Sequence, residues 1–298
     1  MKLVYFGTPD MAVEPLRALC AAKHDVVLVV TGADTRRGRG KSISPCAVKA
    51  AALDLGLEVS NDPLDVLSVD ADLGVVVAFG QIISTQLLDH LSMVNLHFSL
   101  LPRWRGAAPV ERAILAGDAQ TGVCLMEVAE GLDTGGIYAS ETVEIDNRIT
   151  ASELRERLVA VGSGLLVNEL NVGLKHPKPQ SMQGVTYAHK LHPTDSHLNW
   201  GSSSEDLLRV VRVGNAWSSF RHKRFKVISA ISADPEPSEL VCDPQQPPLT
   251  PGTIINPCLV KTGDSWIELL IVQPEGKAAM GASDWARGAH PLGEVLGQ

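Results

Sequence analysis

Residues 73–79 read Leu-Gly-Val-Val-Val-Ala-Phe, an apolar run without alternating polar side chains. A strand with one face in water alternates apolar and polar residues, whereas a parallel strand covered by helices on both faces is apolar throughout. Residues 3–6 and 26–30 have the same character, and each run is followed by a glycine or a threonine. The three runs therefore predict buried strands of a mostly parallel sheet.

Segments with helical spacing separate and follow these strands. Candidate helices cover residues 11–22, 46–55, 84–91, 109–116 and 150–170. The fourth begins with Pro109, which the first turn of a helix tolerates, and the last is entered through Thr150-x-x-Glu153, a capping box. The alternation of strands and helices predicts a Rossmann-like open α/β sheet over residues 1–180.

The loop Gly7-Thr8-Pro9-Asp10 follows the first predicted strand. A dinucleotide-binding fold has a Gly-x-Gly-x-x-Gly loop there, whose amides cradle phosphate. This loop has one glycine and a proline without an N–H, so a nicotinamide cofactor is not expected. Open α/β sheets bind ligands at the carboxyl ends of their strands, and that edge is where Gly7, Phe79 and His97 fall.

The pattern changes beyond residue 180. Residues 181–204 contain Pro193 and three consecutive serines, which is typical of a linker. Residues 207–213 then predict a helix, and residues 225–230, 252–255 and 266–272 predict short strands between Pro- and Gly-containing loops. We expect a small, OB-like β-barrel domain over residues 205–298.

The composition excludes several classes of protein. With 298 residues, of which 45% are hydrophobic, the chain is long enough for two domains. The net charge of −8 speaks against indiscriminate coating of nucleic acid, although a local basic surface remains compatible with it. No apolar run approaches the roughly 18 residues of a membrane-spanning helix, and the N-terminus has no secretory-signal pattern. Five cysteines without a Cys-x-x-Cys spacing argue against a disulfide framework or a structural zinc site. We expect a cytoplasmic protein.

Val94-Asn95-Leu96-His97 carries the first candidate catalytic pair. Residues i and i+2 of a strand share a face, so Asn95 and His97 can reach one substrate atom. An amide is a neutral donor and an imidazole exchanges a proton near pH 7, which suits a transient oxyanion. Asp133, bracketed by glycines, adds an acceptor that could orient the imidazole or receive a proton. Alternatively, Asn95 is a turn residue and His97 is a structural histidine. The Pro- and Gly-flanked tract at residues 99–109 argues against this alternative.

Two basic clusters are candidates for binding an anionic partner. The first, on a glycine-containing loop past the second strand, consists of Arg36, Arg37, Arg39 and Lys41. The second lies between residues 207 and 230, a stretch without acidic residues, and includes Arg209, Arg212, Arg221, Lys223, Arg224 and Lys226. Such residues would supply phosphate contacts with little sequence information. Solvated surfaces are the alternative in both places.

Motifs in order along nearly the whole chain carry a resemblance to a known family. They are Phe6-Gly7-Thr8-Pro9-Asp10, Gly38-Arg39-Gly40-Lys41, Val94-Asn95-Leu96-His97, the tract 99–109, Gly131-Leu132-Asp133-Thr134-Gly135, Thr186-Tyr187-Ala188-His189-Lys190-Leu191 and Gln273-Pro274-Glu275-Gly276-Lys277. The chain resembles the methionyl-tRNA formyltransferase family. Asn-x-His with a downstream Leu-Asp-x-Gly is shared by the wider group of enzymes that use 10-formyltetrahydrofolate. The basic loop, the Arg-Gly-Ala-Ala-Pro tract and the C-terminal extension resemble the tRNA-directed branch.

The resemblance implies transfer of a formyl group from 10-formyltetrahydrofolate to the α-amino group of methionyl initiator tRNA, without a metal and without a covalent enzyme intermediate. It assigns catalysis to Asn95, His97 and Asp133, and the methionine pocket to Met11, where relatives often carry an aromatic residue. It assigns folate binding to Phe79, Gly80, Gln81, Ile83, Ser99, Leu100, Leu101, Pro102, Ala129, Glu130 and Gly131. It places Arg39 at the acceptor stem of the tRNA. From the charge pattern we expect tRNA contacts also from the other basic residues, Arg36, Arg37, Lys41, Arg209, Arg212, Arg221, Lys223 and Arg224. We expect a monomer.

Two other functions remain open from the sequence. The acceptor could be a small amine, such as glycinamide ribonucleotide or an amino sugar on a nucleotide, for which the C-terminal basic cluster would be superfluous. Alternatively, the chain could bind tRNA or folate without turnover, against which the presence of Asn95, His97 and Asp133 argues.

Overall fold

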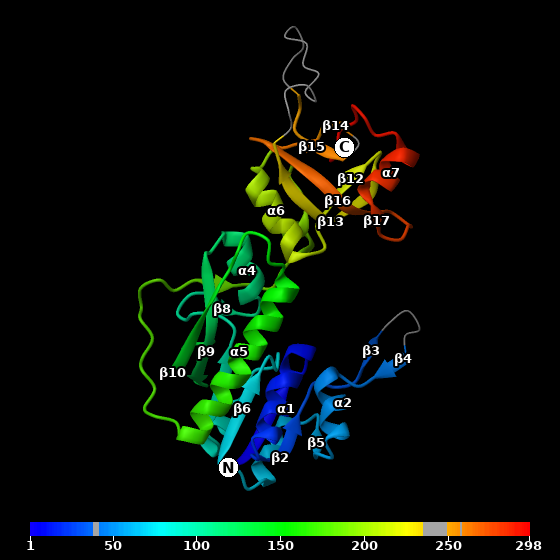
Figure 1. Ribbon diagram of the computed structural model, residues 1–298. Coiled ribbons are helices and arrows are strands. Elements are labelled where there is room, and N and C mark those ends of the chain that lie inside the picture. Colours follow the sequence, from blue (N-terminus) through cyan, green and yellow to red (C-terminus); the bar gives the residue numbers. More distant parts are fainter. Residues whose placement is uncertain (38–41, 235–248, 257) are drawn as a thin grey trace. The chain divides into compact units, whose positions relative to one another are not determined.

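The computed structural model describes residues 1–37, 42–234, 249–256 and 258–298 (Figure 1). The chain forms two compact units. The first comprises residues 1–113, 119–146 and 153–190, and the second residues 114–118, 147–152 and 191–298. Among the described residues, no helix has the length and apolar character needed to cross a membrane.

A seven-stranded sheet forms the first unit, with the strand order β10-β9-β7-β6-β1-β2-β5. Its strands are β1 (Lys2–Gly7), β2 (Asp25–Val30), β5 (Val59–Ser60), β6 (Leu73–Val77), β7 (Met93–His97), β9 (Gln120–Glu127) and β10 (Ile137–Glu144). Five neighbouring strands, β7, β6, β1, β2 and β5, are parallel to one another. At the other edge of the sheet β9 runs antiparallel to β7, and β10 runs antiparallel to β9. The mostly parallel α/β sheet expected from the sequence is therefore confirmed.

Helices cover this sheet (Figure 1). They are α1 (Val13–Ala21), α2 (Ala47–Asp54), α3 (Thr85–His90), α4 (Pro109–Ala116) and α5 (Ala151–Val172), with the short 3₁₀ helices η1 (Asp10–Ala12) and η2 (Pro63–Ser68). All five expected helices are present; α4 has the expected ends, and the ends of the others differ by one or two residues. Gly162 of α5 lies against the sheet, because a Cβ atom there would come within 3.1 Å of Leu96 in β7 and of Val123 in β9.

The loops at the carboxyl ends of β1, β2 and β6 are tied together. The Thr8 hydroxyl donates to the carbonyl of Phe79 at 3.1 Å and accepts from the amide of Gly32 at 3.2 Å. The Phe79 ring turns into the core, edge-on to Phe6 with ring centroids 5.4 Å apart. In a dinucleotide-binding protein this loop binds phosphate. Here its Thr8 side chain instead links the loops that follow β1, β2 and β6.

Two small sheets extend from the first unit. Strand β3 (Thr35–Arg37) pairs with β4 (Ser42–Ser44), and β8 (Arg105–Gly106) pairs in parallel with β11 (Tyr187–Ala188). Of the expected basic loop, Arg39 and Lys41 lie outside the described residues, and Arg36 and Arg37 are described only as backbone of β3.

The second unit is a curled six-stranded antiparallel sheet that forms a half-barrel with the order β12-β13-β16-β15-β14, in which β17 pairs with β16. The strands are β12 (Trp217–Phe220), β13 (Lys223–Ala233), β14 (Ile254–Asn256), β15 (Leu259–Lys261), β16 (Trp266–Pro274) and β17 (Met280–Gly281). Helices α6 (Ser204–Val213) and α7 (Ala282–Ala289) and the 3₁₀ helix η3 (Pro193–Ser196) accompany it.

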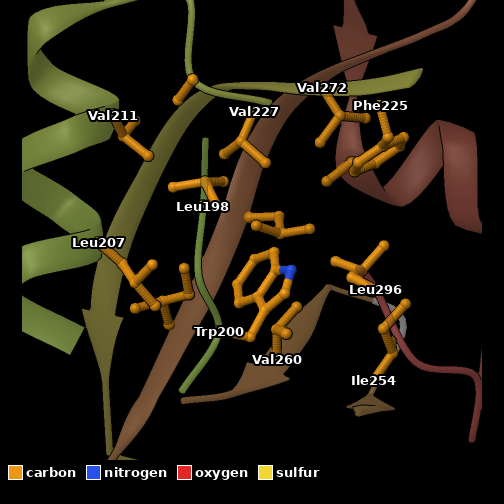
Figure 2. Close-up of a cluster of buried hydrophobic side chains, with 14 of the residues drawn as sticks. Leu198, Trp200, Leu207, Val211, Phe225, Val227, Ile254, Val260, Val272 and Leu296 are labelled. Carbon is orange, nitrogen blue, oxygen red and sulfur yellow. The ribbon is translucent and has the colours of Figure 1, made fainter. Parts of the chain in front are cut away.

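Trp200 lies at the centre of the core of this unit, near Leu198, Val260 and Leu296 (Figure 2). Its indole N–H donates to the Ser218 hydroxyl at 2.9 Å, so the polar edge of a buried ring is satisfied. Residues 191–204, part of the stretch in which the sequence suggests a linker, therefore contribute core side chains to the second unit.

Leu198→Ala should destabilise the second unit. Leu198 is 1% exposed, and truncating a buried leucine costs about 2–5 kcal/mol through reduced burial and the resulting cavity. Urea denaturation followed by tryptophan fluorescence would measure this cost, since four of the five tryptophans lie in this unit. Leu292→Ala, at a side chain that is 66% exposed, is the matched control and should cost less than about 0.5 kcal/mol. Equal effects of the two variants would contradict the assignment of residue 198 to the core.

Candidate active site

Strand β7 places Asn95 and His97 on the same face of the sheet. The strand lies between parallel β6 and antiparallel β9, with Asn95 opposite Val76 and Met126, and His97 opposite Cys124. His97 is 6% exposed and Asn95 is half-buried. Both side chains therefore project from a rigid strand at the edge where open α/β sheets bind ligands.

Asp133 comes to this pair from the loop between β9 and β10. One carboxylate oxygen, Oδ1, lies 3.4 Å from the Asn95 amide nitrogen, and the other, Oδ2, lies 3.6 Å from Nδ1 of His97. The Gly106 amide donates to Oδ2 at 2.8 Å. The structure thus brings together the three residues that the sequence suggested for catalysis, although Asp133 follows β7 by a whole helix and strand.

Each ring nitrogen of His97 faces an oxygen atom. Its Nε2 lies 2.9 Å from the carbonyl oxygen of Trp104, which can only accept, so Nε2 carries a proton. A second proton on Nδ1 would turn the contact with Asp133 into an ion pair. The ring is therefore oriented to exchange a proton at Nδ1, on the side that faces Asn95 and Asp133.

The tract after β7 folds so that the Trp104 carbonyl reaches His97. The Ser99 hydroxyl donates to the Arg103 carbonyl at 2.6 Å, and the Thr186 hydroxyl accepts from the Trp104 amide at 2.9 Å. Trp104 has a left-handed backbone (φ 64°), and the Arg103 guanidinium lies over its indole, 4.3 Å from the ring centroid. These contacts fix the peptide group that orients the imidazole.

Arg105 and Gln180 also belong to the site, although the sequence had not assigned either of them to it. Arg105 is 6% exposed, and its Nε and Nη2 donate to Oε1 of Gln180 at 3.1 and 2.7 Å. The Gln180 amide nitrogen donates to the carbonyls of Asp133 and Gly135, both at 2.8 Å. The signal in the sequence is Arg105 between Trp104 and the small residues Gly106, Ala107 and Ala108, since an arginine that is buried there needs a partner.

The residues expected to bind folate lie in three loops of the first unit. Gly80 and Gln81 are exposed and Ile83 is half-buried after β6, and Ala129, Glu130 and Gly131 are exposed after β9. Ile83 and Val128 both pack against the hydrophobic cluster that contains Phe79. The side chain of Phe79 is itself in the core, which leaves its backbone for a ligand.

The third loop lies next to His97 in sequence. Ser99 and Leu101 are buried, and Leu100 and Pro102 are half-buried. Leu101 packs with Cys124 and Met126 of β9, and burial raises the pKa of the Cys124 thiol to about 11. Cys124 is therefore a core residue, because a nucleophilic cysteine needs an accessible thiolate.

The remaining expected site residues lie elsewhere. Met11 is half-buried in η1, which follows the carboxyl end of β1. In the parts of the chain that the structure describes, no three His, Cys, Asp or Glu side chains gather as a metal site would need.

The basic residues of the second unit differ in their surroundings. Arg209 pairs with Glu205 and Asp206, and Arg221 pairs with Glu294, so acids from outside the 207–230 stretch offset both charges. Nη1 of Arg212 lies 3.4 Å from the Ile149 carbonyl oxygen. Lys223 and Arg224 are exposed, and the Arg224 guanidinium lies over the Trp217 ring, 4.4 Å from its centroid.

Two solved structures illustrate the likeness in fold. An N-formyltransferase from Helicobacter canadensis, in complex with folinic acid and dTDP-3-aminofucose, matches 92% of this chain and 99% of its own at 16% identity and a TM-score of 0.65. HypX from Aquifex aeolicus, in complex with tetrahydrofolic acid, matches 96% of this chain at 14% identity and a TM-score of 0.64, and this chain spans 47% of its length.

Sequence comparison is more specific. The formyl transferase family model matches residues 1–170, and the model of the formyl transferase C-terminal domain matches residues 190–290. Methionyl-tRNA formyltransferase from Thermobifida fusca is 40% identical to this chain, over 97% of each sequence. The resemblance that the sequence motifs suggested is confirmed, and the chain belongs to the methionyl-tRNA formyltransferase family.

Proposed function

We propose that this protein transfers the formyl group of 10-formyltetrahydrofolate to the α-amino group of methionyl initiator tRNA. The observation that carries the proposal is the convergence of Asn95, His97 and Asp133 at the carboxyl edge of the sheet. The relative named methionyl-tRNA formyltransferase, aligned over nearly the whole chain, supports this acceptor. The folinic acid in the complex from Helicobacter canadensis supports a folate donor.

The chemistry follows from the donors that the protein presents. The neutral amine of the acceptor attacks the formyl carbon, and the formyl oxygen becomes an oxyanion. Asn95 Nδ2 and His97 Nδ1 both face the Asp133 carboxylate at distances longer than good hydrogen bonds. An oxyanion that enters between the two nitrogens would meet the Asn95 amide as one donor and, when the imidazole carries its second proton, Nδ1 of His97 as the other. Each such donor contributes on the order of 3 kcal/mol to the transition state.

Asp133 would serve the proton side of the reaction. Its carboxylate supports a positive charge on His97 and can accept the proton that the attacking amine loses, directly or through water. The tetrahedral intermediate then collapses, the bond from carbon to the folate nitrogen breaks, and that nitrogen takes up the proton that Asp133 accepted from the amine, directly or through water. The protein therefore needs no covalent intermediate and no metal for this sequence of steps.

The folate and tRNA sites are parts of the same proposal. Folate would lie against residues 79–83, 99–102 and 129–131, the methionine side chain near Met11, and the acceptor stem against the loop that carries Arg39. We assign residues 1–180 to a catalytic domain, 181–204 to a linker whose last part packs into the second unit, and 205–298 to a tRNA-binding domain. A monomer acting in the cytoplasm fits a translation enzyme.

A small amine is the second candidate acceptor. The N-formyltransferase from Helicobacter canadensis has the same fold and binds dTDP-3-aminofucose, which is an amine of this class. Incubation with 10-formyltetrahydrofolate and, separately, charged initiator tRNA, charged elongator tRNA, glycinamide ribonucleotide and the amino sugar nucleotide would decide between them. Formylation of initiator tRNA above all others supports the proposal, and preference for a small amine would overturn it.

Replacement of Asn95 or His97 by Ala should lower turnover by about 100-fold or more, because each removes a donor to the developing oxyanion. The affinity for tRNA should change little, since these groups act chiefly on the transition state. Steady-state kinetics together with a filter-binding titration would measure both quantities. Near-normal turnover in either variant would contradict the assignment.

Asp133→Asn should reduce turnover as much as His97→Ala. The variant keeps the shape of the side chain but removes both the proton acceptor and the charge that faces the imidazole. The double variant should lose little more than either single variant, because the two groups act as a unit. Additive losses in a double-mutant cycle would show that the two residues act independently.

Arg39→Ala should lower turnover on methionyl-tRNA at least several-fold while folate binding, measured by titration, stays intact.

Replacing Arg221, Lys223 and Arg224 together should instead weaken tRNA binding and flatten the plot of log affinity against log salt by about 0.9 for each phosphate that is no longer neutralised. Arg221→Ala alone is the matched control, because Glu294 already offsets that charge. Unchanged kinetics and an unchanged salt slope would leave a folate-dependent formyltransferase with another acceptor.

A further inference from the structure

Gln180 makes four hydrogen bonds through one side-chain amide. It accepts two from the Arg105 guanidinium and donates one to each of the carbonyls of Asp133 and Gly135. The orientation of the amide follows from its partners, because a guanidinium can only donate and a carbonyl can only accept. Both amide hydrogens and both acceptor positions of this side chain are therefore hydrogen-bonded to two loops of the candidate site.

The backbone of Asp133 needs such support. It has φ 50°, in the left-handed region that residues with a Cβ rarely adopt unless their surroundings hold them there. Gln180 holds its carbonyl oxygen directly at 2.8 Å. Relaxation of this peptide to an ordinary conformation would rotate the carboxylate away from His97.

Gln180 also acts on the carboxylate from the other side. By fixing Arg105, it holds β8, and the next residue, Gly106, donates its amide proton to Oδ2 of Asp133 at 2.8 Å. The Asp133 main chain and side chain are thus fixed through the same amide. A neutral amide does this without adding a second negative charge next to the carboxylate.

We propose that Gln180 is a positioning residue for the formyl-transfer reaction, which holds the Asp133 carboxylate in reach of His97 and Asn95. This inference depends on the proposed function insofar as its kinetic test uses formyl transfer. It assigns a role in the reaction to the segment that follows α5, which carries no group that would touch the reacting atoms.

Two substitutions show whether Gln180 acts by holding the carbonyl of Asp133 or only by holding Arg105. Gln180→Leu removes all four hydrogen bonds, whereas Gln180→Glu keeps an acceptor for Arg105 but removes the donor to the two carbonyls. If Gln180 positions Asp133, both variants should lower kcat by about 10- to 100-fold, a loss of the size seen when the hydrogen-bond partner behind a metal ligand is removed. The KM values for both substrates should stay within about twofold of wild type.

Gln183 provides the matched control. It is exposed in the same segment, so Gln183→Leu and Gln183→Glu should keep wild-type kcat. In the Asp133→Asn background, Gln180→Leu should cause no further loss, because the group that it positions has already been disabled. A Gln180→Glu variant as active as wild type, or a full loss in the Asp133→Asn background, would overturn the proposal.

A readout without catalysis keeps the two proposals apart. Nitrogen-15 NMR of the His97 ring, assigned with a His97→Asn variant, reports the proton and the partner at Nδ1. In Gln180→Glu, which keeps an acceptor for Arg105, the Nδ1 signal should shift while the protein keeps its thermal midpoint within a few degrees. An unshifted Nδ1 signal would overturn the role of Gln180 even if wild type formylates tRNA. Failure of wild type to formylate any acceptor would overturn the proposed function, and the NMR comparison would still test the positioning of Asp133.

Discussion

The hydrogen bond from the Gly106 amide to the Asp133 carboxylate joins the parts of the site. Gly106 lies in the tract that follows β7, and Asp133 in the loop that follows β9. Gly106 has φ 121°, and a Cβ atom there would come within 2.8 Å of the Ala188 carbonyl oxygen in β11. Only glycine allows this close approach of two backbones without strain. The tract after β7, the loop after β9 and the segment after α5 therefore meet at one peptide group, and the positions of His97, Asp133 and Gln180 all depend on it.

Local patterns are sufficient to predict the frame of the first unit and half of its candidate site. Continuous apolar runs identify β1, β2 and β6, and the two-residue period of a strand places Asn95 and His97 on one face. The antiparallel strand β10 is not predicted, because its sequence, Ile-Tyr-Ala-Ser-Glu-Thr-Val-Glu, belongs to a half-exposed edge strand without a continuous apolar run. The distance between Asp133 and His97 depends on how loops fold over the sheet edge, and periodicity contains no information about that.

Long-range partners explain the other differences. Residues 181–204 look like a linker because they are polar and contain proline and serine, yet two large apolar residues, Leu198 and Trp200, decide where the last part of that stretch packs. Residues 207–230 lack acids in the sequence, but folding brings Glu294 to Arg221 from far along the chain. A count of charges along a segment therefore overstates its positive potential, and Lys223 and Arg224 are the better candidates for contacts with an anion.

Gly162 in α5 lies behind the strand that carries Asn95 and His97, so the helix on the opposite face of the sheet can influence the active site. Leu96, which lies against this glycine, is flanked in the strand by Asn95 and His97, so a side chain added at position 162 would press on the Leu96 side chain, which would have to shift by a few tenths of an ångström. Changes on that helix can therefore alter reactivity in lineages where every group near the substrate is unchanged. A search for the origin of differing activities among relatives would have to include positions that no substrate ever touches.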